Sequence, residues 1–362
     1  MSDTLKPATG LSRRTFLTTS AVAGLGLSLG FPAVHGAKAQ NAGKVIYATW
    51  GGSWEAAIKK AWFEPFTKAT GIEVVTAQDN NYGKFQSMVE SGSVEWDVVE
   101  TNPDFQYIGA EKGLLEPLDF SVIDKSKIMK GEGFVTEYSV PQVLWSRLMA
   151  YNTKALGDKV PMDYTAIFND VAGFPGKRAF QSEPNSGAFE AALLAAGVAP
   201  DKLYPLDIDK ALEKWTEIKD HISFYETNAQ AQQYISDGQA SLSIMPDGRA
   251  MAAIKDGSPV GIQYNQSIMT WSSMVVPKGA PNKANAMKFL AYTMTPEAQA
   301  AIANEYTYGP VVPDAFKFIS PERAKILSGG PQQQGKFIMA NEEWWAKNLE
   351  EATERLTEWR LS

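Results

Sequence analysis

Apolar and polar residues follow one another along this chain in a pattern that predicts strands alternating with helices. Residues 44–49 (KVIYAT) are mostly β-branched or aromatic, which predicts a short buried strand. From Trp54 to Phe66 the apolar residues recur every three or four positions, which predicts a helix with one buried face. Trp50-Gly51-Gly52-Ser53 lies between them, and Ser53 is placed to cap the helix. A strand therefore ends, and a helix begins, at a turn that carries a tryptophan.

The same order continues downstream. Residues 72–77 (IEVVTA) and 96–100 (WDVVE) predict two more strands, and Asn102 with Pro103 predicts the start of a helix after the second. Strands alternating with helices predict an α/β fold with parallel, doubly wound sheets, in which ligands bind at the carboxyl ends of the strands. Further strands are predicted at residues 178–181, 240–245, 261–263 and 271–276.

The first forty residues have the pattern of an export signal. Ser12-Arg13-Arg14-Thr15-Phe16-Leu17 precedes an apolar run rich in glycine and alanine, and Ala37-Lys38-Ala39 offers small residues at the spacing of a cleavage site. Residues 1–39 therefore resemble a twin-arginine signal peptide, cleaved near Ala39. The apolar run is shorter than the roughly 20 residues that span a bilayer. We expect export by the twin-arginine translocase to the periplasm.

Composition excludes several classes of function. The chain has 362 residues, enough for about two domains, and its net charge of −7 disfavours nucleic acid as a partner. It has no cysteine, which excludes disulfides, thiolate metal sites and cysteine nucleophiles. The two histidines, His35 and His221, form no metal-ligand or Ser-His motif. We expect a monomer that needs no cofactor or metal and is not an enzyme.

Several segments, taken in order, resemble the periplasmic solute-binding proteins of ABC transporters. More narrowly, the chain resembles the branch that holds the spermidine/putrescine receptors, with thiamine and iron receptors as relatives. The resemblance implies two α/β lobes of the type II kind, joined by crossing hinge strands, that close over a ligand and deliver it to a membrane permease. The segments are the strand-Trp-helix opening, PFTKATGIEV, WDVVETNPDF, EKGLLEPLD, ISDGQASLSIMPDGRA and KANAMKFLAYTMTPEAQAAI.

The resemblance also implies where the lobes begin and end. Lobe 1 is expected to comprise residues 44–147 and 272–314, and lobe 2 residues 152–264 and 318–362. The hinges are expected near residues 148–151, 265–271 and 315–317.

In such receptors the ligand lies between the lobes, against aromatic rings and carboxylates. The resemblance places Trp50 where a tryptophan stacks on an organic cation, and Asn102 with Asp104 as the polar pair that follows a strand. Trp271 and Tyr308 correspond to further aromatic residues of the site. An aromatic face attracts a cation by about 0.5–2 kcal/mol, and a carboxylate adds a charge-assisted hydrogen bond.

Lobe 1 departs from the polyamine pattern in two ways. Ser272-Ser273 stands where polyamine receptors carry an aspartate, and a hydroxyl cannot neutralise an ammonium group. Gly52 and Ser53 present backbone N–H groups at a helix start, which favours an anion.

Lobe 2 supplies candidates from two turns. Glu183 and Ser186 follow the strand at residues 178–181, although a turn by itself explains both residue types. Asp247 and Arg249 follow the strand at residues 240–245, where they either pair with each other or face the cleft. An arginine is a poor neighbour for a polyamine and a good partner for a carboxylate or phosphate.

Together these residues predict a small organic amine as the ligand, either polyamine-like or zwitterionic. Thiamine, an aminophosphonate and an ω-amino acid are the alternatives that remain open. Asn102 and Asp104 can also serve only the start of their helix. An exported hydrolase is a rival class of function, and a sensory partner of a membrane receptor fits the same features as a transport receptor.

Overall fold

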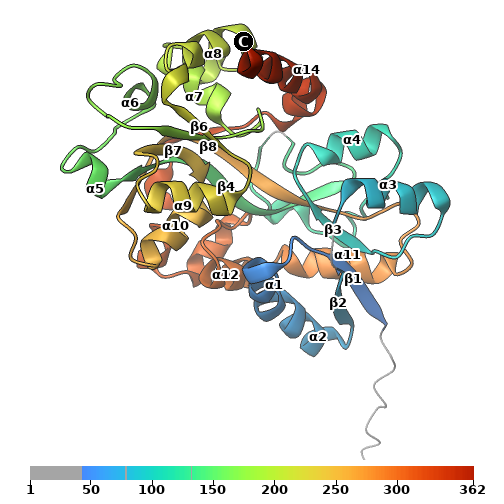
Figure 1. Ribbon diagram of the computed structural model, residues 1–362. Coiled ribbons are helices and arrows are strands. Elements are labelled where there is room, and N and C mark those ends of the chain that lie inside the picture. The colour runs from blue at the N-terminus through green and yellow to red at the C-terminus, as the bar shows by residue number, and fades with distance from the viewer. Residues whose placement is uncertain (1–42, 78–79, 132) are drawn as a thin grey trace, which may run out of the picture. The chain divides into compact units, whose positions relative to one another are not determined.

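The computed structural model describes residues 43–77, 80–131 and 133–362, so the predicted signal peptide lies outside the described residues. Their nine strands form one mixed sheet in the order β2-β1-β3-β8-β4-β7-β5-β6, and β9 pairs with β8. Helices pack around this sheet (Figure 1). The predicted α/β class is confirmed. No helix among these residues is both long and apolar enough to cross a membrane.

The first side of the sheet is built from the amino-terminal strands. β1 (Lys44–Ala48) lies between β2 (Glu73–Ala77) and β3 (Val98–Thr101), and both pairings are parallel, as alternation with helices requires. The helices of this side are α1 (Gly52–Ile58), which continues through a π-helical turn (Lys59–Phe63) into α2 (Glu64–Thr70), then α3 (Tyr82–Ser91), α4 (Phe105–Glu111), α11 (Lys283–Thr293) and α12 (Pro296–Glu305). Pro296 is the first residue of α12 and separates it from α11.

The second side repeats the same architecture. β5 (Arg178–Gln181) pairs in parallel with β6 (Ile222–Tyr225) and with β7 (Leu242–Pro246). Its helices are α5 (Thr153–Leu156), α6 (Thr165–Phe168), α7 (Ala188–Ala195), α8 (Ile208–Thr216), α9 (Asn228–Ser236), α10 (Asp247–Lys255) and α14 (Glu342–Leu361). The short helix α13 (Pro321–Ala324) and strand β9 (Phe337–Met339) lie in the connection that precedes α14.

Two long antiparallel strands join the two sides. β4 (Ser139–Asn152) and β8 (Val260–Val275) pair along most of their length, with register shifts between Pro141 and Val143 and between Arg147 and Met149. β8 also pairs with β3 of the first side, and β4 with β7 of the second. The sequence predicts two separate strands within β8, and β4 pairs with both of them, which joins the two predicted sheets into one. Residues 264–267 between these strands have no partner in β4, and Gln266 there has a positive φ of 64°.

Two predicted helix starts were wrong. α1 begins at Gly52 with Gly51 as its N-cap, so Ser53 is not the cap. Gly51 has φ 76° and ψ −166°, a backbone conformation that suits glycine and lets the chain turn one residue earlier. α4 begins at Phe105, and Asn102 therefore precedes the N-cap position, which Asp104 occupies without a side-chain capping bond.

Buried residues gather into separate clusters on the two sides. One cluster contains Tyr47, Trp62 and Trp271, and another contains Trp215 and Trp345. This division agrees with a two-lobe arrangement, although the residue boundaries of the lobes stay a prediction. Residues 315–327 include apolar side chains that pack on α12, an element that the prediction assigns to lobe 1.

We predict that Trp215→Ala lowers the free energy of unfolding by about 3–5 kcal/mol, because a large buried side chain leaves a cavity. Trp215 is fully buried, its ring centroid lies 5.1 Å from those of Phe180 and Phe189, and its Nε1 donates to the carbonyl of Ala188 at 3.2 Å. Trp50→Ala is the matched control, because the Trp50 side chain is 49% exposed. Denaturant unfolding of both variants measures the difference; equal losses would contradict the assignment of Trp215 to the core.

Candidate ligand-binding site

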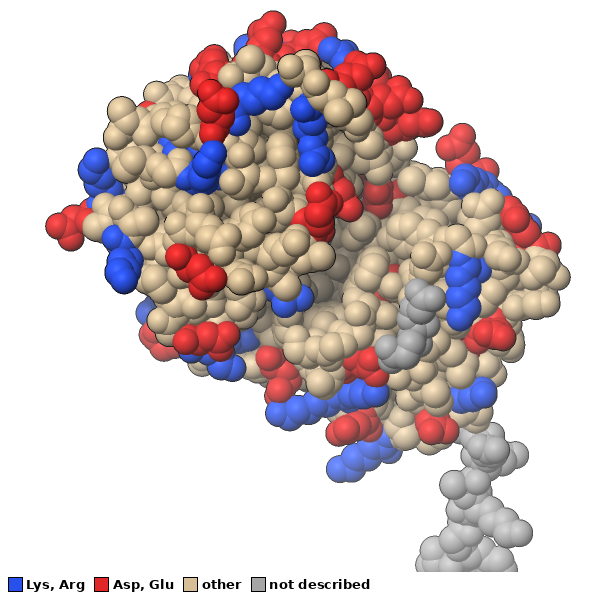
Figure 2. Space-filling view, in the orientation of Figure 1, with Lys and Arg blue, Asp and Glu red and all other residues tan. Residues whose placement is uncertain are grey.

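A cavity of about 420 Å³, open to solvent, lies over the crossing strands. Its wall comes from both sides of the sheet: the turn before α1 and the loop after α12 on the first, and the ends of β5 and β7 on the second. We call it the cleft. Figure 2 shows this face of the molecule hollowed, with acidic and basic side chains around the hollow. The cleft brings together seven residues that the sequence predicts for the site: Trp50, Gly52, Ser53, Asn102, Glu183, Arg249 and Tyr308.

The turn that carries Trp50 is held by the carboxylate of Glu100, at the end of β3. This side chain is completely buried and accepts hydrogen bonds from β1, from the turn, from α1 and from β4. The backbone N–H of Trp50 is one of the donors. The others are Thr49 Oγ1 at 2.7 Å, Trp54 Nε1 at 2.8 Å, Gln142 Nε2 at 2.9 Å and Tyr47 Oη at 3.2 Å.

These hydrogen bonds favour the ionised form of the Glu100 carboxyl and hold Trp50 in position. Burial raises the pKa of the Glu100 carboxyl, and the bonds from Gln142, Trp54, Trp50 and Thr49 oppose that rise by favouring the ionised form. Gly51 and Gly52 both have positive φ, 76° and 64°, so the backbone turns sharply above the carboxylate. The hydrogen bonds to Glu100 therefore hold the backbone of the turn in place, while the Trp50 ring lies in the cleft.

Two arginines supply positive charge to the cleft. Arg147 projects from β4 beside Trp145, and its guanidinium carbon lies 4.7 Å from the centroid of that ring. Arg249 is exposed in the first turn of α10, which follows Pro246, the residue of β7 that pairs with Arg147. No ion pair joins either arginine to a carboxylate of the described residues. Both guanidinium groups are therefore available for an anionic ligand group.

Acceptor groups lie on the second side of the cleft. Glu183 is exposed after β5 and accepts a hydrogen bond from Gln181 Nε2 at 3.2 Å. Asn228 begins α9, and its Oδ1 has no hydrogen-bond partner among the described residues although the atom is buried. A carboxylate and an unsatisfied amide oxygen on one wall suit a ligand group that donates hydrogen bonds, such as an ammonium.

Four predicted residues do not line the cleft. Trp271 is 1% exposed and stacks on Phe134 with ring centroids 4.6 Å apart, so it belongs to the core of the first side. Asp104 and Ser186 are buried, and each has one side-chain oxygen without a hydrogen-bond partner. Burial raises the pKa of the Asp104 carboxyl, and the charge of Arg147 opposes this.

Asp247, the fourth, is buried beneath the turn that it shares with Arg249. Its Oδ1 accepts the backbone N–H of Gly248 at 2.7 Å, and its Oδ2 accepts the hydroxyl of Ser328. It forms no ion pair with Arg249. α10 begins at Asp247, and the helical backbone directs the carboxylate inward while Arg249 lies at the surface. Burial raises the pKa of the Asp247 carboxyl to about 7.

Several residues of the cleft wall are not among those predicted from the sequence. Trp145 and Arg147 are two positions apart on β4, so strand alternation places both on the face toward the cleft. That spacing is the one sequence signal for these two residues. No sequence pattern marks Asn228 or Gln181 as a ligand-binding residue, because the start of a helix explains the first and the end of a strand explains the second. Other lining residues not predicted for the site are Gly51, Trp54, Pro246, Ser272 and Tyr306.

Comparison with known proteins identifies relatives over most of the chain. The family model described as bacterial extracellular solute-binding protein matches residues 61–327. A gamma-aminobutyric acid-binding protein of Pseudomonas aeruginosa is 31% identical over 338 residues, which cover 91% of this chain and 94% of the relative. A solved structure of a GABA receptor is 40% identical, covers 88% of this chain and 97% of its own, and superposes with a TM-score of 0.80. The spermidine/putrescine-binding periplasmic protein of Escherichia coli K12 is 21% identical over 301 residues, covering 81% of this chain and 84% of the relative.

We predict that Glu100→Ala lowers the free energy of unfolding by about 3 kcal/mol or more, because five donors lose a buried acceptor. Glu100→Gln keeps one acceptor oxygen and is expected to lose less. Denaturant unfolding at pH 7 compares the two variants. Wild-type stability in Glu100→Ala would show that these bonds do not hold the turn.

A second prediction concerns Asp247 and pH. An unfolded aspartate loses its proton near pH 4, whereas the folded one keeps it up to about pH 7, so the folded state binds more protons between these values. Stability should therefore fall as the pH rises from 4 to 7. Asp247→Asn, which keeps the acceptor for Gly248, should flatten this fall in Tm, whereas the exposed Asp237→Asn should not. Parallel pH profiles for wild type and Asp247→Asn would contradict the prediction.

Proposed function

The chain belongs to the family of bacterial extracellular solute-binding proteins, and from this premise we propose that it captures a short zwitterionic ω-amino acid, such as γ-aminobutyric acid, for an ABC importer. The observation that carries the proposal is the pair of unpaired arginines, Arg147 and Arg249, in a cleft that also holds Glu183 and the ring of Trp50. This family consists of transport proteins and is not an enzyme family.

In this proposal the arginines receive the carboxylate of the ligand. Arg147 lies on a strand of the cleft floor, with its guanidinium held against Trp145, so part of its conformational freedom is already lost before a ligand binds. A guanidinium binds a carboxylate through two parallel hydrogen bonds. Arg249 approaches from α10, and closure of the two sides would bring it toward the same group.

The ammonium end of the ligand meets Glu183, Asn228 and the face of Trp50. The aromatic face attracts the cation, and the two oxygen acceptors accept its hydrogen bonds. Ser272 also lines the cleft, and by the resemblance the pair Ser272-Ser273 stands where the polyamine receptors carry an aspartate. A polyamine needs a carboxylate for each ammonium, so the arginines and Ser272 favour a ligand with one positive and one negative end.

The comparisons support this choice between the two kinds of amine. The relative that is 31% identical is named for γ-aminobutyric acid, whereas the polyamine-binding relative is 21% identical. Thiamine and an aminophosphonate are the alternative ligands for the charged groups of this cleft. The proposal includes export by the twin-arginine translocase with cleavage near Ala39, a monomer in the periplasm, and lobes with the boundaries given above.

Isothermal titration tests the proposal with four probes: γ-aminobutyrate, 2-aminoethylphosphonate, thiamine and putrescine. We expect γ-aminobutyrate to bind most tightly. Arg147→Ala should weaken it at least tenfold, because each lost factor of ten corresponds to about 1.4 kcal/mol and a charged hydrogen-bonded pair is worth more. Arg355→Ala, on the far helix α14, is the matched control and should bind like the wild type.

The opposite pattern would overturn the proposal. Putrescine binding more tightly than γ-aminobutyrate, together with Arg147→Ala or Arg249→Ala improving putrescine binding, would identify a polyamine receptor. Wild-type affinity for γ-aminobutyrate in both arginine variants would remove the arginines from the site.

A further inference from the structure

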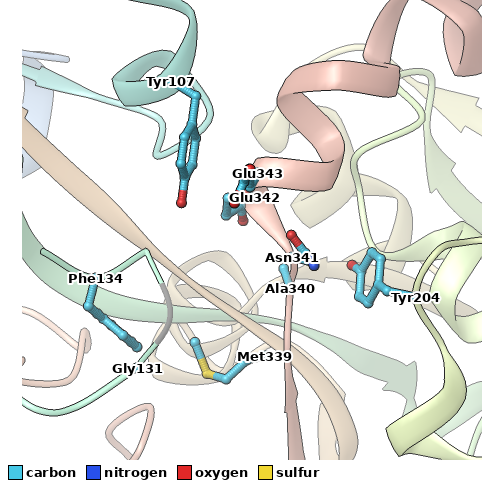
Figure 3. A pocket seen from close by; sticks show the side chains of 9 residues that line it. All are labelled: Tyr107, Gly131, Phe134, Tyr204, Met339, Ala340, Asn341, Glu342 and Glu343. Atoms are coloured by element: carbon cyan, nitrogen blue, oxygen red, sulfur yellow. The ribbon is translucent and has the colours of Figure 1, made fainter. Parts of the chain in front are cut away.

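A second cavity, of about 190 Å³ and partly open, lies between α4 and the start of α14. It shares no lining residue with the cleft. Figure 3 shows Tyr107 of α4 on one side, Glu342 and Glu343 at the start of α14 facing it, and Phe134 and Tyr204 at its two ends. The cavity therefore has walls from both sides of the sheet.

The charge of this cavity is opposite to that of the arginine-bearing cleft. Glu342 and Glu343 line it, and none of the lining residues that the structure describes is a lysine or an arginine. Glu343 pairs with Lys347 one turn along α14, at 2.5 Å, so its charge is already partly balanced. Glu342 has no ion pair among the described residues, and only the longer-range charge of Arg147 opposes the cost of its ionisation.

Glu342 is buried, and only one of its two carboxylate oxygens accepts a hydrogen bond from the described residues. Its side chain is 6% exposed, and one carboxylate oxygen accepts the hydroxyl of Thr270 on β8. The other oxygen accepts no hydrogen bond from the residues that the structure describes. Burial raises the pKa of this carboxyl to about 7; Arg147 opposes the rise, and Asp104 and Glu190 add to it. Arg147 therefore offsets only part of the cost of burying this carboxylate, and a cation bound at its second oxygen would lower that cost further.

The walls select the kind of cation. Tyr107, Phe134 and Tyr204 present aromatic rings, which attract organic ammonium groups. A hard divalent cation instead needs about six to eight oxygen ligands. The described residues contain no group of three or more histidine, cysteine, aspartate or glutamate side chains that could hold a metal ion.

We propose that this cavity is a second binding site, separate from the cleft, that takes a small organic cation with a primary ammonium group. The ammonium donates to the free oxygen of Glu342, and the alkyl part lies against Tyr107 and Phe134. Because Tyr107 and Phe134 belong to the first side and Glu342 to the second, the bound cation contacts both. The site does not depend on the proposed ligand of the cleft.

The test is isothermal titration of the full protein with n-propylammonium chloride at pH 8, where Glu342 is ionised. We expect saturable binding that falls at least fivefold in Glu342→Gln and in Tyr107→Ala. Glu350→Gln, an exposed change on the same helix, should bind as the wild type does. Trp50→Ala, which alters only the cleft, should keep the propylammonium affinity, and Glu342→Gln should keep the affinity for γ-aminobutyrate.

Three results would overturn the proposal. The first is no saturable binding of propylammonium to the wild type. The second is binding that Trp50→Ala removes while Glu342→Gln and Tyr107→Ala leave it unchanged, which would place the amine in the cleft. The third is displacement of propylammonium by calcium chloride at matched ionic strength, which would identify a metal site. Tyr107→Ala leaves the Glu342–Thr270 bond in place, so it decides the question if Glu342→Gln does not fold.

Discussion

The carboxylate of Glu100 accepts hydrogen bonds from β1, from the turn after it, from α1 and from β4, and the geometry of the cleft depends on this convergence. A buried acceptor cannot exchange one of these donors for water, so each bond restrains the segment that supplies it. The turn can then expose Trp50 to the cleft without becoming loose. The same carboxylate ties β4 to the first side through Gln142, five residues before Arg147 on the cleft floor.

The crossing strands β4 and β8 hold the two sides of the sheet together. Their pairing is continuous enough to join the two sets of parallel strands, while the buried clusters on either side remain distinct. Strand alternation directs Trp145 and Arg147 toward the cleft and leaves Leu144 and Trp271 in the core. A ligand that binds residues from both sides at once would stabilise the arrangement in which those sides approach each other.

Charge is distributed differently in the two cavities. The cleft carries unpaired arginines on its floor and one wall, with acceptor groups on the second side, which suits a zwitterion. The cavity beside α14 combines aromatic rings with a buried glutamate and, among the described residues, has no basic one in its lining, which suits a cation alone. Arg147 is the electrostatic link between them, because its charge also opposes the raised pKa of Asp104 and Glu342.

The sequence by itself determined the α/β class, the family resemblance and the turn that carries Trp50, because hydrophobic periodicity and glycine spacing are local properties of the chain. It also predicted, through Arg249 and Ser272-Ser273, that the ligand carries a negative group beside its positive one or only one positive end. The tertiary structure decided which candidates share one cavity. Asp247 and Arg249 lie in one turn, yet the start of α10 buries the first and exposes the second; Trp271 has a partner in Phe134, which is distant in the sequence. The donors to Glu100 lie up to 53 positions away in the chain. Arg147 is placed by the pairing of β4 with β7 and β8, and no local pattern records such pairing.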